Sequence, residues 1–194
     1  MAQKATIYKV ELSVSNMDRH YYETHKLTIA KHPSETDERM MLRILAFALN
    51  AHEQLEMTKG ISTDDEPDIW QKNYGGELEL WINLGLPSDK VVRQSCGKSK
   101  SVIIYAYGGN PADMWWLKIQ NSTTRFDNLS VMNIPQNETQ ELARLAHRSM
   151  QMQVNIQEGE VMISVGDEFV YVNPIELKAA CIPSRPLRQS GSFA

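Results

Sequence analysis

The sequence predicts an α/β fold, in which helices flank a mixed sheet and an antiparallel meander closes the chain. Stretches that alternate with period two take turns with stretches at helical spacing. The apolar run at 101–107 follows a helix that itself follows a strand, which is typical of a βαβ unit with parallel strands. Three short alternating segments end the pattern, and turns at 158–159 and 166–167 join them.

The composition is that of a globular protein of one domain. The chain has 194 residues, 42% of them hydrophobic and 23% charged, and a formal net charge of −4. This charge argues against a protein that coats bulk polyanions, but it is compatible with a local basic groove. We expect residues 1–182 to form a single domain and 183–194 to form a loose tail, since the periodic pattern fades after Pro174.

Membrane and secretory signals are absent. No apolar run approaches the roughly 20 residues of a transmembrane helix, and the stretch MAQKATIYKV lacks the apolar part of a signal peptide. Cys96 and Cys181 are far apart and outside any CxxC pair, which indicates reduced thiols and argues against zinc. We therefore expect a cytoplasmic protein with no membrane partner, in which Cys96 has a packing role.

The first elements are a pair of strands and a buried helix. Residues 5–14 and 21–29 alternate with period two around a turn at 16–19. Ser34 is the expected N-cap of the helix, because Asp37 stands three residues later, as in a capping box. Apolar residues cover most of this helix, which predicts burial on most sides, and the helix is expected to end at 59–60, where a glycine suits the C-terminal position.

The rest of the chain alternates between the two periods. The expected elements after a turn at 73–76 are a strand at 77–84, a helix at 90–98, a strand at 101–107, a helix at 113–120, a strand at 128–134, a helix at 137–150, and strands at 151–157, 160–165 and 168–172.

Several well-known catalytic motifs are missing. The chain has no GxGxxG that opens a helix, no Walker A loop and no GxSxG elbow. Its five histidines are not paired at metal-ligand spacing. The Gly108-Gly109 turn follows a buried strand, which is where an α/β protein binds ligands, but it lacks the glycine spacing that cradles a phosphate.

Acidic residues lie on both arms of the hairpin at 65–84. With the turn centred between residues 74 and 75, Trp70 lies opposite Glu79 and Asp68 lies opposite Trp81. Asp68 and Glu79, with Glu77 as a further candidate, are therefore expected to converge on one face. Mg²⁺ is held by two or so carboxylates together with waters and phosphate oxygens. The solvated face of an amphipathic hairpin explains the same pattern, and the spacing alone leaves both interpretations open.

A basic helix follows the hairpin. Arg93 and Lys98 lie in it, and either would balance the charge of a phosphate. Cations near the C-terminus of a helix also interact favourably with the helix dipole, so this feature too has an ordinary explanation.

Six segments match a known family. They are KATIYK at 4–9, HPSETDERMMLR at 32–43, DEP at 65–67, LWINLGLP at 80–87, the tryptophan pair at 115–116 and NLSV at 128–131. On these segments the sequence resembles the YaeQ family of bacterial proteins. The match spans most of the chain up to its C-terminal tail.

The resemblance implies a variant of the PD-(D/E)XK nuclease fold, whose restriction-endonuclease-like core contains a helix, a three-stranded hairpin sheet, a crossover helix and another strand. Carried over by position, Glu38 is the acid on the helix, Asp68 the acid on the second strand and Glu79 the third acid. The three would hold magnesium. Trp81 stands where the motif has its lysine, so that role has moved to Lys98 or Arg93, or has been lost.

Two functions follow from these expectations. The first is a magnesium-dependent nuclease, in which Glu38, Asp68 and Glu79 converge and a basic residue lies nearby. The second is a catalytically silent descendant that binds nucleic acid or a protein partner. It predicts splayed or ion-paired acids, and it is compatible with an exposed patch that includes the tryptophans at 81, 115 or 116, although large aromatic residues are more often found in the core.

Overall fold

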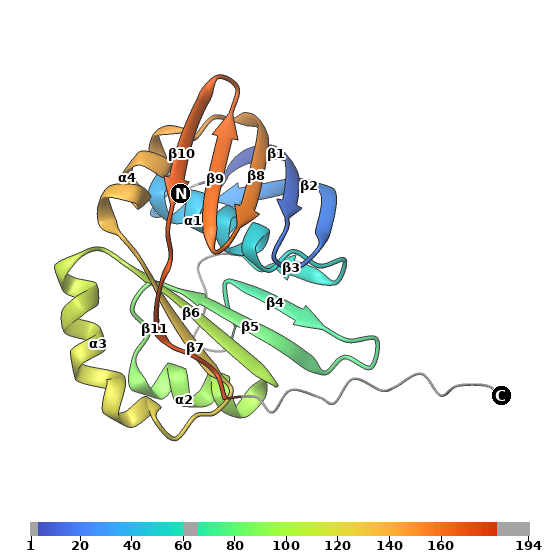
Figure 1. The fold of residues 1–194 in the computed structure, drawn as a ribbon. Helices are drawn as coiled ribbons and strands as arrows, with labels where there is room; N and C mark the ends of the chain where they lie inside the picture. The colour runs from blue at the N-terminus through green and yellow to red at the C-terminus, as the bar shows by residue number, and fades with distance from the viewer. Residues whose placement is uncertain (1–3, 60–65, 182–194) are drawn as a thin grey trace.

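Two β-sheets and four helices make up the part of the chain that the computed structural model describes, residues 4–59 and 66–181 (Figure 1). The strands of the first sheet, sheet A, span Thr6–Asn16 (β1), Tyr21–Lys31 (β2), Ser149–Gln157 (β8), Glu160–Val165 (β9) and Glu168–Val172 (β10). The strands of sheet B span Leu55–Met57 (β3), Ile69–Lys72 (β4), Leu78–Leu84 (β5), Ser101–Tyr107 (β6), Leu129–Ile134 (β7) and Ile175–Lys178 (β11). The helices span Asp37–Leu49 (α1), Asp89–Lys98 (α2), Asn110–Thr123 (α3) and Gln136–Arg144 (α4).

The predicted α/β class is confirmed, but the strands form two mixed sheets where one was expected. Sheet A has the order β10-β9-β8-β1-β2 and sheet B the order β11-β7-β6-β5-β4-β3. Strands β5, β6 and β7 are parallel, as expected for βαβ units, and β8, β9 and β10 form the predicted antiparallel meander. The meander joins the N-terminal strands through a parallel pairing of β1 with β8, in which Val10 lies opposite Met150.

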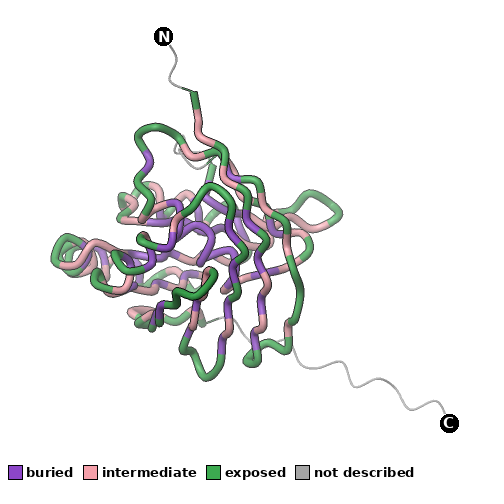
Figure 2. The backbone as a smooth tube through the Cα atoms, turned by 90° about the horizontal axis from the view of Figure 1, so that it is seen from above, coloured by how far each residue is buried: buried purple, intermediate pink, exposed green. Residues whose placement is uncertain are grey.

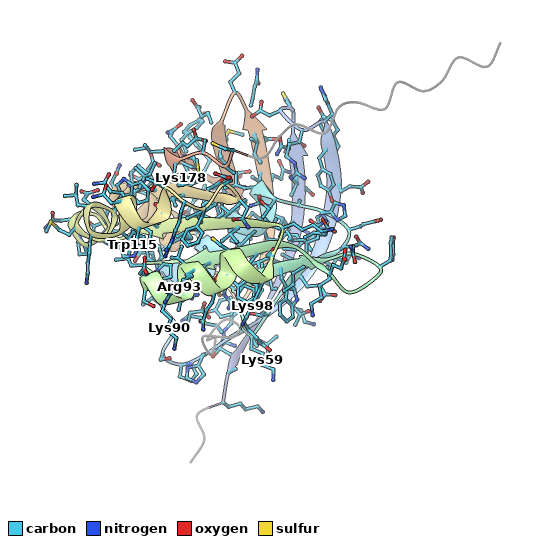
Figure 3. All side chains as sticks on the ribbon, turned by 90° about the horizontal axis from the view of Figure 1, so that it is seen from below. Lys59, Lys90, Arg93, Lys98, Trp115 and Lys178 are labelled. Atoms are coloured by element: carbon cyan, nitrogen blue, oxygen red, sulfur yellow. The ribbon has the colours of Figure 1, made fainter. Side chains whose placement is uncertain are left out.

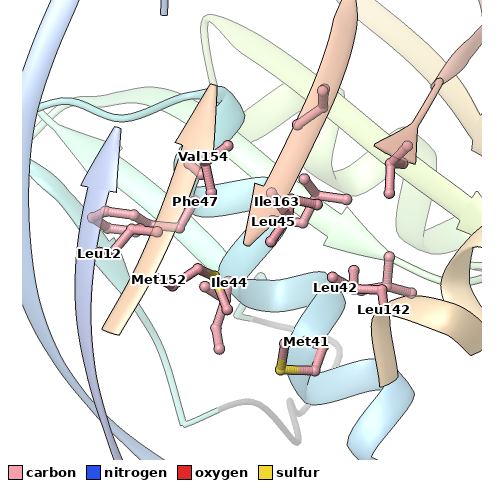
Figure 4. Close-up of a cluster of buried hydrophobic side chains, with 14 of the residues drawn as sticks. Leu12, Met41, Leu42, Ile44, Leu45, Phe47, Leu142, Met152, Val154 and Ile163 are labelled. Carbon is pink, nitrogen blue, oxygen red and sulfur yellow. The ribbon is translucent and has the colours of Figure 1, made fainter. Parts of the chain in front are cut away.

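Helix α1 packs against both sheets and is buried on most sides, as predicted. All its residues from Met40 to Ala48 are buried. In the close-up of Figure 4, Ile44 and Phe47 lie among the side chains of sheet A, and Leu42 lies beside Leu142 of α4. The same apolar cluster includes Ile82 of sheet B. The burial-coloured trace of Figure 2 accordingly runs purple through the interior of the molecule.

Both ends of α1 differ from the prediction. The N-cap is Thr36, whose hydroxyl accepts a hydrogen bond of 3.1 Å from the Arg39 N–H, whereas the Ser34 hydroxyl is bonded to His32 Nδ1. The helix ends at Leu49 because Asn50 caps it through its backbone and its side-chain amide. The sequence beyond Asn50 continues at helical spacing only by coincidence, since Leu55 begins β3. Gly60 and Asp65 lie outside the described residues, as does the predicted tail at 183–194.

Two later helices also have different bounds. Helix α4 ends at Arg144 rather than near residue 150, because Met150 is drawn into the pairing of β8 with β1. Helix α3 begins at Asn110, three residues earlier than expected. Gly109 forms its N-cap with φ +69°, a conformation that favours glycine, and a proline follows in the first turn.

Helices α2 and α3 cover the face of sheet B that is turned away from α1. A second apolar cluster lies beneath them and contains Trp81, Val92 and Ile119. Trp81 is only 2% exposed, so its predicted core position is confirmed, and Trp115 and Trp116 are half-buried. Among the described residues, none of the helices is long and apolar enough to cross a membrane.

Candidate functional site

A cluster of charged side chains is buried where the start of α1 meets β4 and β5. Glu35, Arg43 and Asp68 are all at most 5% exposed. Glu35 lies just before α1, and Arg39 and Arg43 follow at intervals of four residues, which places the three side chains on one side of the helix. Asp68 comes from the residue before β4. The sequence separation of the two parts means that the fold, rather than local structure, assembles this cluster.

Two short ion pairs hold the cluster together. Arg39 Nη2 lies 2.7 Å from Asp68 Oδ1, and Arg43 Nη2 lies 2.8 Å from Glu35 Oε2. The second Asp68 oxygen accepts a hydrogen bond of 2.8 Å from the Leu84 N–H. Because both oxygens of Asp68 are engaged, this carboxylate links α1 to the hairpin of β4 and β5. Buried charges persist in a protein interior only when they are paired in this way.

Electrostatic interactions extend the cluster to Tyr107, at the end of β6. Burial would lower the pKa of the Arg39 guanidinium, but the charge and hydrogen bond of Asp68 outweigh burial and raise that pKa. Burial raises the pKa of Tyr107, and Glu38, Asp68 and Glu35 raise it further, while Arg39 acts in the opposite direction. Tyr107 is therefore a neutral phenol at physiological pH, and it lies within the electrostatic reach of three carboxylates.

Glu38 is hydrogen-bonded to α4. Its Oε1 accepts a hydrogen bond of 2.5 Å from the hydroxyl of Thr139, a fully buried residue of α4. Glu38 and Asp68 both act on the pKa of Tyr107, so two of the three predicted metal ligands lie around the same tyrosine. Each of the two is already engaged by a hydrogen-bond donor.

The predicted register of the hairpin is wrong by two residues. Trp70 pairs with Trp81, not with Glu79. The turn is centred at Gly75, because Lys72 pairs with Leu78, and this accounts for one residue of the offset. A bulge between Gln71 and Lys72 accounts for the other. The period-two alternation of the strands indicates neither the centre of a glycine-rich turn nor the position of a bulge.

Glu79 consequently lies away from Asp68. It is five residues before Leu84, whose N–H donates to the Asp68 carboxylate, and five residues span roughly 17 Å along a β-strand. Its Oε1 accepts bonds of 2.6 Å from Lys100 Nζ and 2.9 Å from Asn73 Nδ2. The bond from Lys100 contributes most to a lowered pKa of Glu79.

The two predicted basic residues belong to α2, across sheet B from α1. Arg93 is exposed, and Lys98 Nζ lies 5.6 Å from the centroid of the Trp81 ring. The structure therefore places neither Arg93 nor Lys98 beside Asp68. Cys96, also in α2, is half-buried, and burial raises its pKa to about 11, which suits the packing role expected of it.

This arrangement does not fit a magnesium ion held by Glu38, Asp68 and Glu79. Asp68 is neutralised by Arg39, and Glu79 lies at the other end of the hairpin. Within residues 4–59 and 66–181, no three His, Cys, Asp or Glu side chains are grouped in a way that would hold a metal. The carboxylates therefore have structural partners where a metal site would need free oxygens.

Sequence reasoning located Asp68 and Glu38 but missed Glu35, Arg39 and Arg43. A signal was present in the segment ETDERMMLR. Arg43 interrupts an apolar stretch in the middle of a helix that is buried on most sides, and Glu35 and Arg39 precede it at the spacing of helical neighbours. A charge on a buried helical face requires a partner, and that requirement points to an ion-pair cluster.

Comparisons with known proteins agree on one family. A family model described as "YaeQ protein" matches residues 1–174. A relative from Salmonella typhi named "Uncharacterized protein YaeQ" is 41% identical over 164 residues, 84% of this chain and 91% of the relative. A relative of the same name from Escherichia coli (strain K12) is 39% identical over 173 residues, 89% of this chain and 96% of the relative.

Solved structures give the same result. The crystal structure of the YaeQ protein from Xanthomonas axonopodis pv. citri matches with a TM-score of 0.87 and 44% identity over 90% of this chain and 99% of the other. That of the YaeQ protein from Pseudomonas syringae matches with a TM-score of 0.86 and 32% identity over 90% of this chain and 97% of the other. The chain therefore belongs to the YaeQ family.

Proposed function

We propose that this protein binds nucleic acid through the outer face of α2, and that its buried carboxylates stabilise the fold instead of holding a catalytic metal. The observation that carries the proposal is the charge of that face. The exposed charged side chains of α2 are Lys90, Arg93 and Lys98, all cations (Figure 3). The acidic Asp89 is half-buried at the start of the helix and accepts a hydrogen bond from Ser122.

A local positive face on an acidic protein is what phosphate binding requires. The whole chain carries a formal charge of −4, so the cations of α2 stand out against an acidic background. Lysine and arginine side chains that neutralise phosphates release counterions, and this term supplies most of the affinity of sequence-independent binding.

Helix α3 packs beside α2 and carries two half-buried tryptophans, Trp115 and Trp116. Trp115 Nε1 donates a bond of 2.8 Å to Pro87 O, just before α2, which holds the two helices together. Unpaired bases stack on aromatic side chains, so the partly exposed tryptophans beside the cations of α2 suit single-stranded nucleic acid.

The state of the carboxylates supports a binding role over a hydrolytic one. The silent-descendant hypothesis expects splayed or ion-paired acids. Asp68 is paired with Arg39, Glu79 is paired with Lys100, and these two carboxylates lie at different ends of the hairpin. A nuclease with PD-(D/E)XK chemistry would need both to be free and convergent.

Binding is tested by fluorescence anisotropy with labelled single- and double-stranded DNA and RNA over a series of salt concentrations. We expect the double variant Lys90→Ala/Arg93→Ala to bind more weakly, with the slope of log K against log salt reduced by about 1 for each phosphate that is no longer neutralised. The matched control is Lys9→Ala/Lys26→Ala, which removes the same charge from exposed positions on sheet A and should bind like the unmodified protein. Equal binding by both double variants would contradict the proposal.

The competing function, magnesium-dependent cleavage, is tested on the same oligonucleotides. They are incubated with the protein in magnesium and in manganese, beside Asp68→Asn and Glu79→Gln. We expect no cleavage. Cleavage that is lost in both variants would overturn the binding-only proposal and restore the predicted metal site, and cleavage that survives both would place the chemistry elsewhere.

A further inference from the structure

The face of sheet A that is turned away from α1 carries an uncharged band across all five strands (Figure 1). The strand pairings place its outward side chains opposite one another in rows. One row, from β10 to β2, contains Tyr171, Met162, Asn155, Ser15 and Tyr22. The next row contains Phe169, Ser164, Gln153, Ser13 and Thr24. The two rows form a neutral band, because none of these positions is charged, although 23% of the whole chain is.

Aromatic rings stand at both ends of the neutral band. Tyr22 is 57% exposed at the β2 end, and Phe169 and Tyr171 are 62% and 46% exposed at the β10 end. Neighbouring strands lie about 4.8 Å apart, so the backbones of the two tyrosines are roughly 19 Å apart across the sheet. Only an extended ligand of several units reaches both ends.

The polar side chains between the rings are available to a ligand. The hydroxyls of Ser13 and Thr24 are bonded to each other at 3.0 Å, and the other polar side chains of the band make no hydrogen bond to the described residues. Among them are the amides of Gln153 and Asn155. Amides and hydroxyls both donate and accept hydrogen bonds, so a ligand rich in hydroxyl groups matches them in both roles.

A hollow of about 410 Å³ adjoins the band near the turn between β8 and β9. Asn155 and Met162 belong to the band and also line this hollow. Glu158 and Glu160 line it as well. Their carboxylates accept hydrogen bonds from hydroxyl groups and repel a phosphate, so the hollow too favours an uncharged ligand.

We infer that the neutral band binds a neutral oligosaccharide, which lies across the strands with sugar rings stacked on Tyr22 at one end and on Tyr171 at the other. Sugar rings present flat faces of C–H groups that pack on aromatic rings. Their hydroxyls exchange hydrogen bonds with Gln153 and Asn155 between the two tyrosines.

Two other occupants match the band less well. Nucleic acid is held by lysine and arginine side chains that neutralise its phosphates, and the band contains neither. A second protein surface packed on the band would bury the amides of Gln153 and Asn155, and a buried polar group without a hydrogen-bond partner is destabilising. Sheet faces that pack on other sheets are instead lined by apolar side chains.

Isothermal titration calorimetry of the full chain with maltoheptaose, cellohexaose, xylohexaose and mannohexaose tests this inference. We expect at least one of them to bind, and its constituent monosaccharide to bind far more weakly, because a single ring cannot reach both ends of the band. Tyr22→Ala and Tyr171→Ala should each weaken binding by about tenfold, the usual effect of removing an aromatic anchor. Asn155→Ala should weaken binding too, since it removes an amide shared by the band and the hollow.

The matched control is Tyr74→Ala, which removes an exposed tyrosine from the hairpin turn of sheet B and should bind like the unmodified chain. Circular dichroism melting curves verify that each variant is folded. The inference is overturned if none of the oligosaccharides binds, if the monosaccharide binds equally well, or if either folded tyrosine variant of the band binds as tightly as the unmodified chain. Binding of single-stranded RNA that is lost in Tyr22→Ala would also overturn it, by assigning the band to nucleic acid.

This inference is independent of the proposed nucleic-acid binding, because α2 packs on sheet B. Lys90→Ala/Arg93→Ala should bind the oligosaccharide like the unmodified chain, whereas Tyr22→Ala should leave the binding of nucleic acid to α2 unchanged. Loss of oligosaccharide binding in Lys90→Ala/Arg93→Ala would place the sugar site on α2 and contradict the inference.

Discussion

Arg43 is only 1% exposed in the ion-pair cluster, and Glu35 is its counter-ion at 2.8 Å. Substitution by methionine keeps the apolar stem but removes the cation. Glu35 is then left with Arg39 Nη1 at 3.8 Å as its remaining cationic neighbour. Removing one partner of a buried pair typically costs about 3–5 kcal/mol, because an uncompensated charge stays in the interior. We expect Arg43→Met to lower the free energy of unfolding, measured by urea denaturation, by about that amount.

Two further variants make this prediction specific. Glu35→Leu/Arg43→Met removes both charges and should recover a large part of the loss, since apolar pairs often replace buried ion pairs without penalty. Lys100→Met breaks ion pairs whose lysine is 53% exposed and should lower the free energy of unfolding far less than Arg43→Met does. If Arg43→Met costs no more than Lys100→Met, the cluster is not a stabilising unit.

The individual site residues show how far sequence reasoning extends. Asp68 is identifiable because an acid next to a strand stands out locally. Its partner Arg39 lies 29 residues earlier, and nothing in the alternation of either segment indicates that the two meet. Glu79 has a different neighbour from the predicted one because one turn centre and one bulge move its strand by two positions. Residue identity is predictable here, but contacts across the fold are not.

At the scale of elements, the N-terminus of α1 provides a direct test of which residue caps the helix. The Thr36 hydroxyl accepts the Arg39 N–H, which would otherwise lack a partner in the first turn. Replacing such a cap by alanine costs typically about 1 kcal/mol. We therefore expect Thr36→Ala to lower the urea midpoint of unfolding. Ser34→Ala removes only an exposed bond to His32 and should change this midpoint little. A larger effect from Ser34→Ala would restore the cap expected from the sequence.

Elements whose signals are local agree well with the prediction. The strands β5 and β6, helix α2 and the three strands of the meander fall within a few residues of the expected bounds, because periodicity and turn residues define them. The ends of α1 and α4 differ from the expected ones for another reason. In each case apolar residues continue at helical spacing into a strand, and pairing with a distant strand decides the outcome.

At the scale of the molecule, the division into two sheets rests on the pairing of β1 with β8. Strand β8 follows the α/β part of the chain and returns to the N-terminal hairpin, so Lys9 lies opposite Ser149. The alternation of residues within a strand does not indicate which distant strand it pairs with, and this explains why one sheet was expected. The two sheets are joined by α1, since a single apolar cluster contains Leu12 of sheet A, Ile44 of α1 and Ile82 of sheet B.

This shared cluster predicts that the two sheets unfold together, as expected of a single domain. All four tryptophans lie on or beside sheet B, so their fluorescence reports that half, and hydrogen exchange of the β1 and β8 amides reports sheet A. We expect both probes to give the same urea midpoint. Ile44→Ala, at a fully buried position between the sheets, should lower the free energy of unfolding reported by the two probes equally, by about 2–5 kcal/mol. Val92→Ala, beneath α2 in the second cluster, touches only the sheet B side, and cooperative unfolding requires that it too lower the stability seen by both probes equally. The prediction is contradicted if the amides of sheet A lose their protection from hydrogen exchange at a lower urea concentration than the one at which tryptophan fluorescence changes. The sheets would then be separate folding units, and α1 would belong to only one of them.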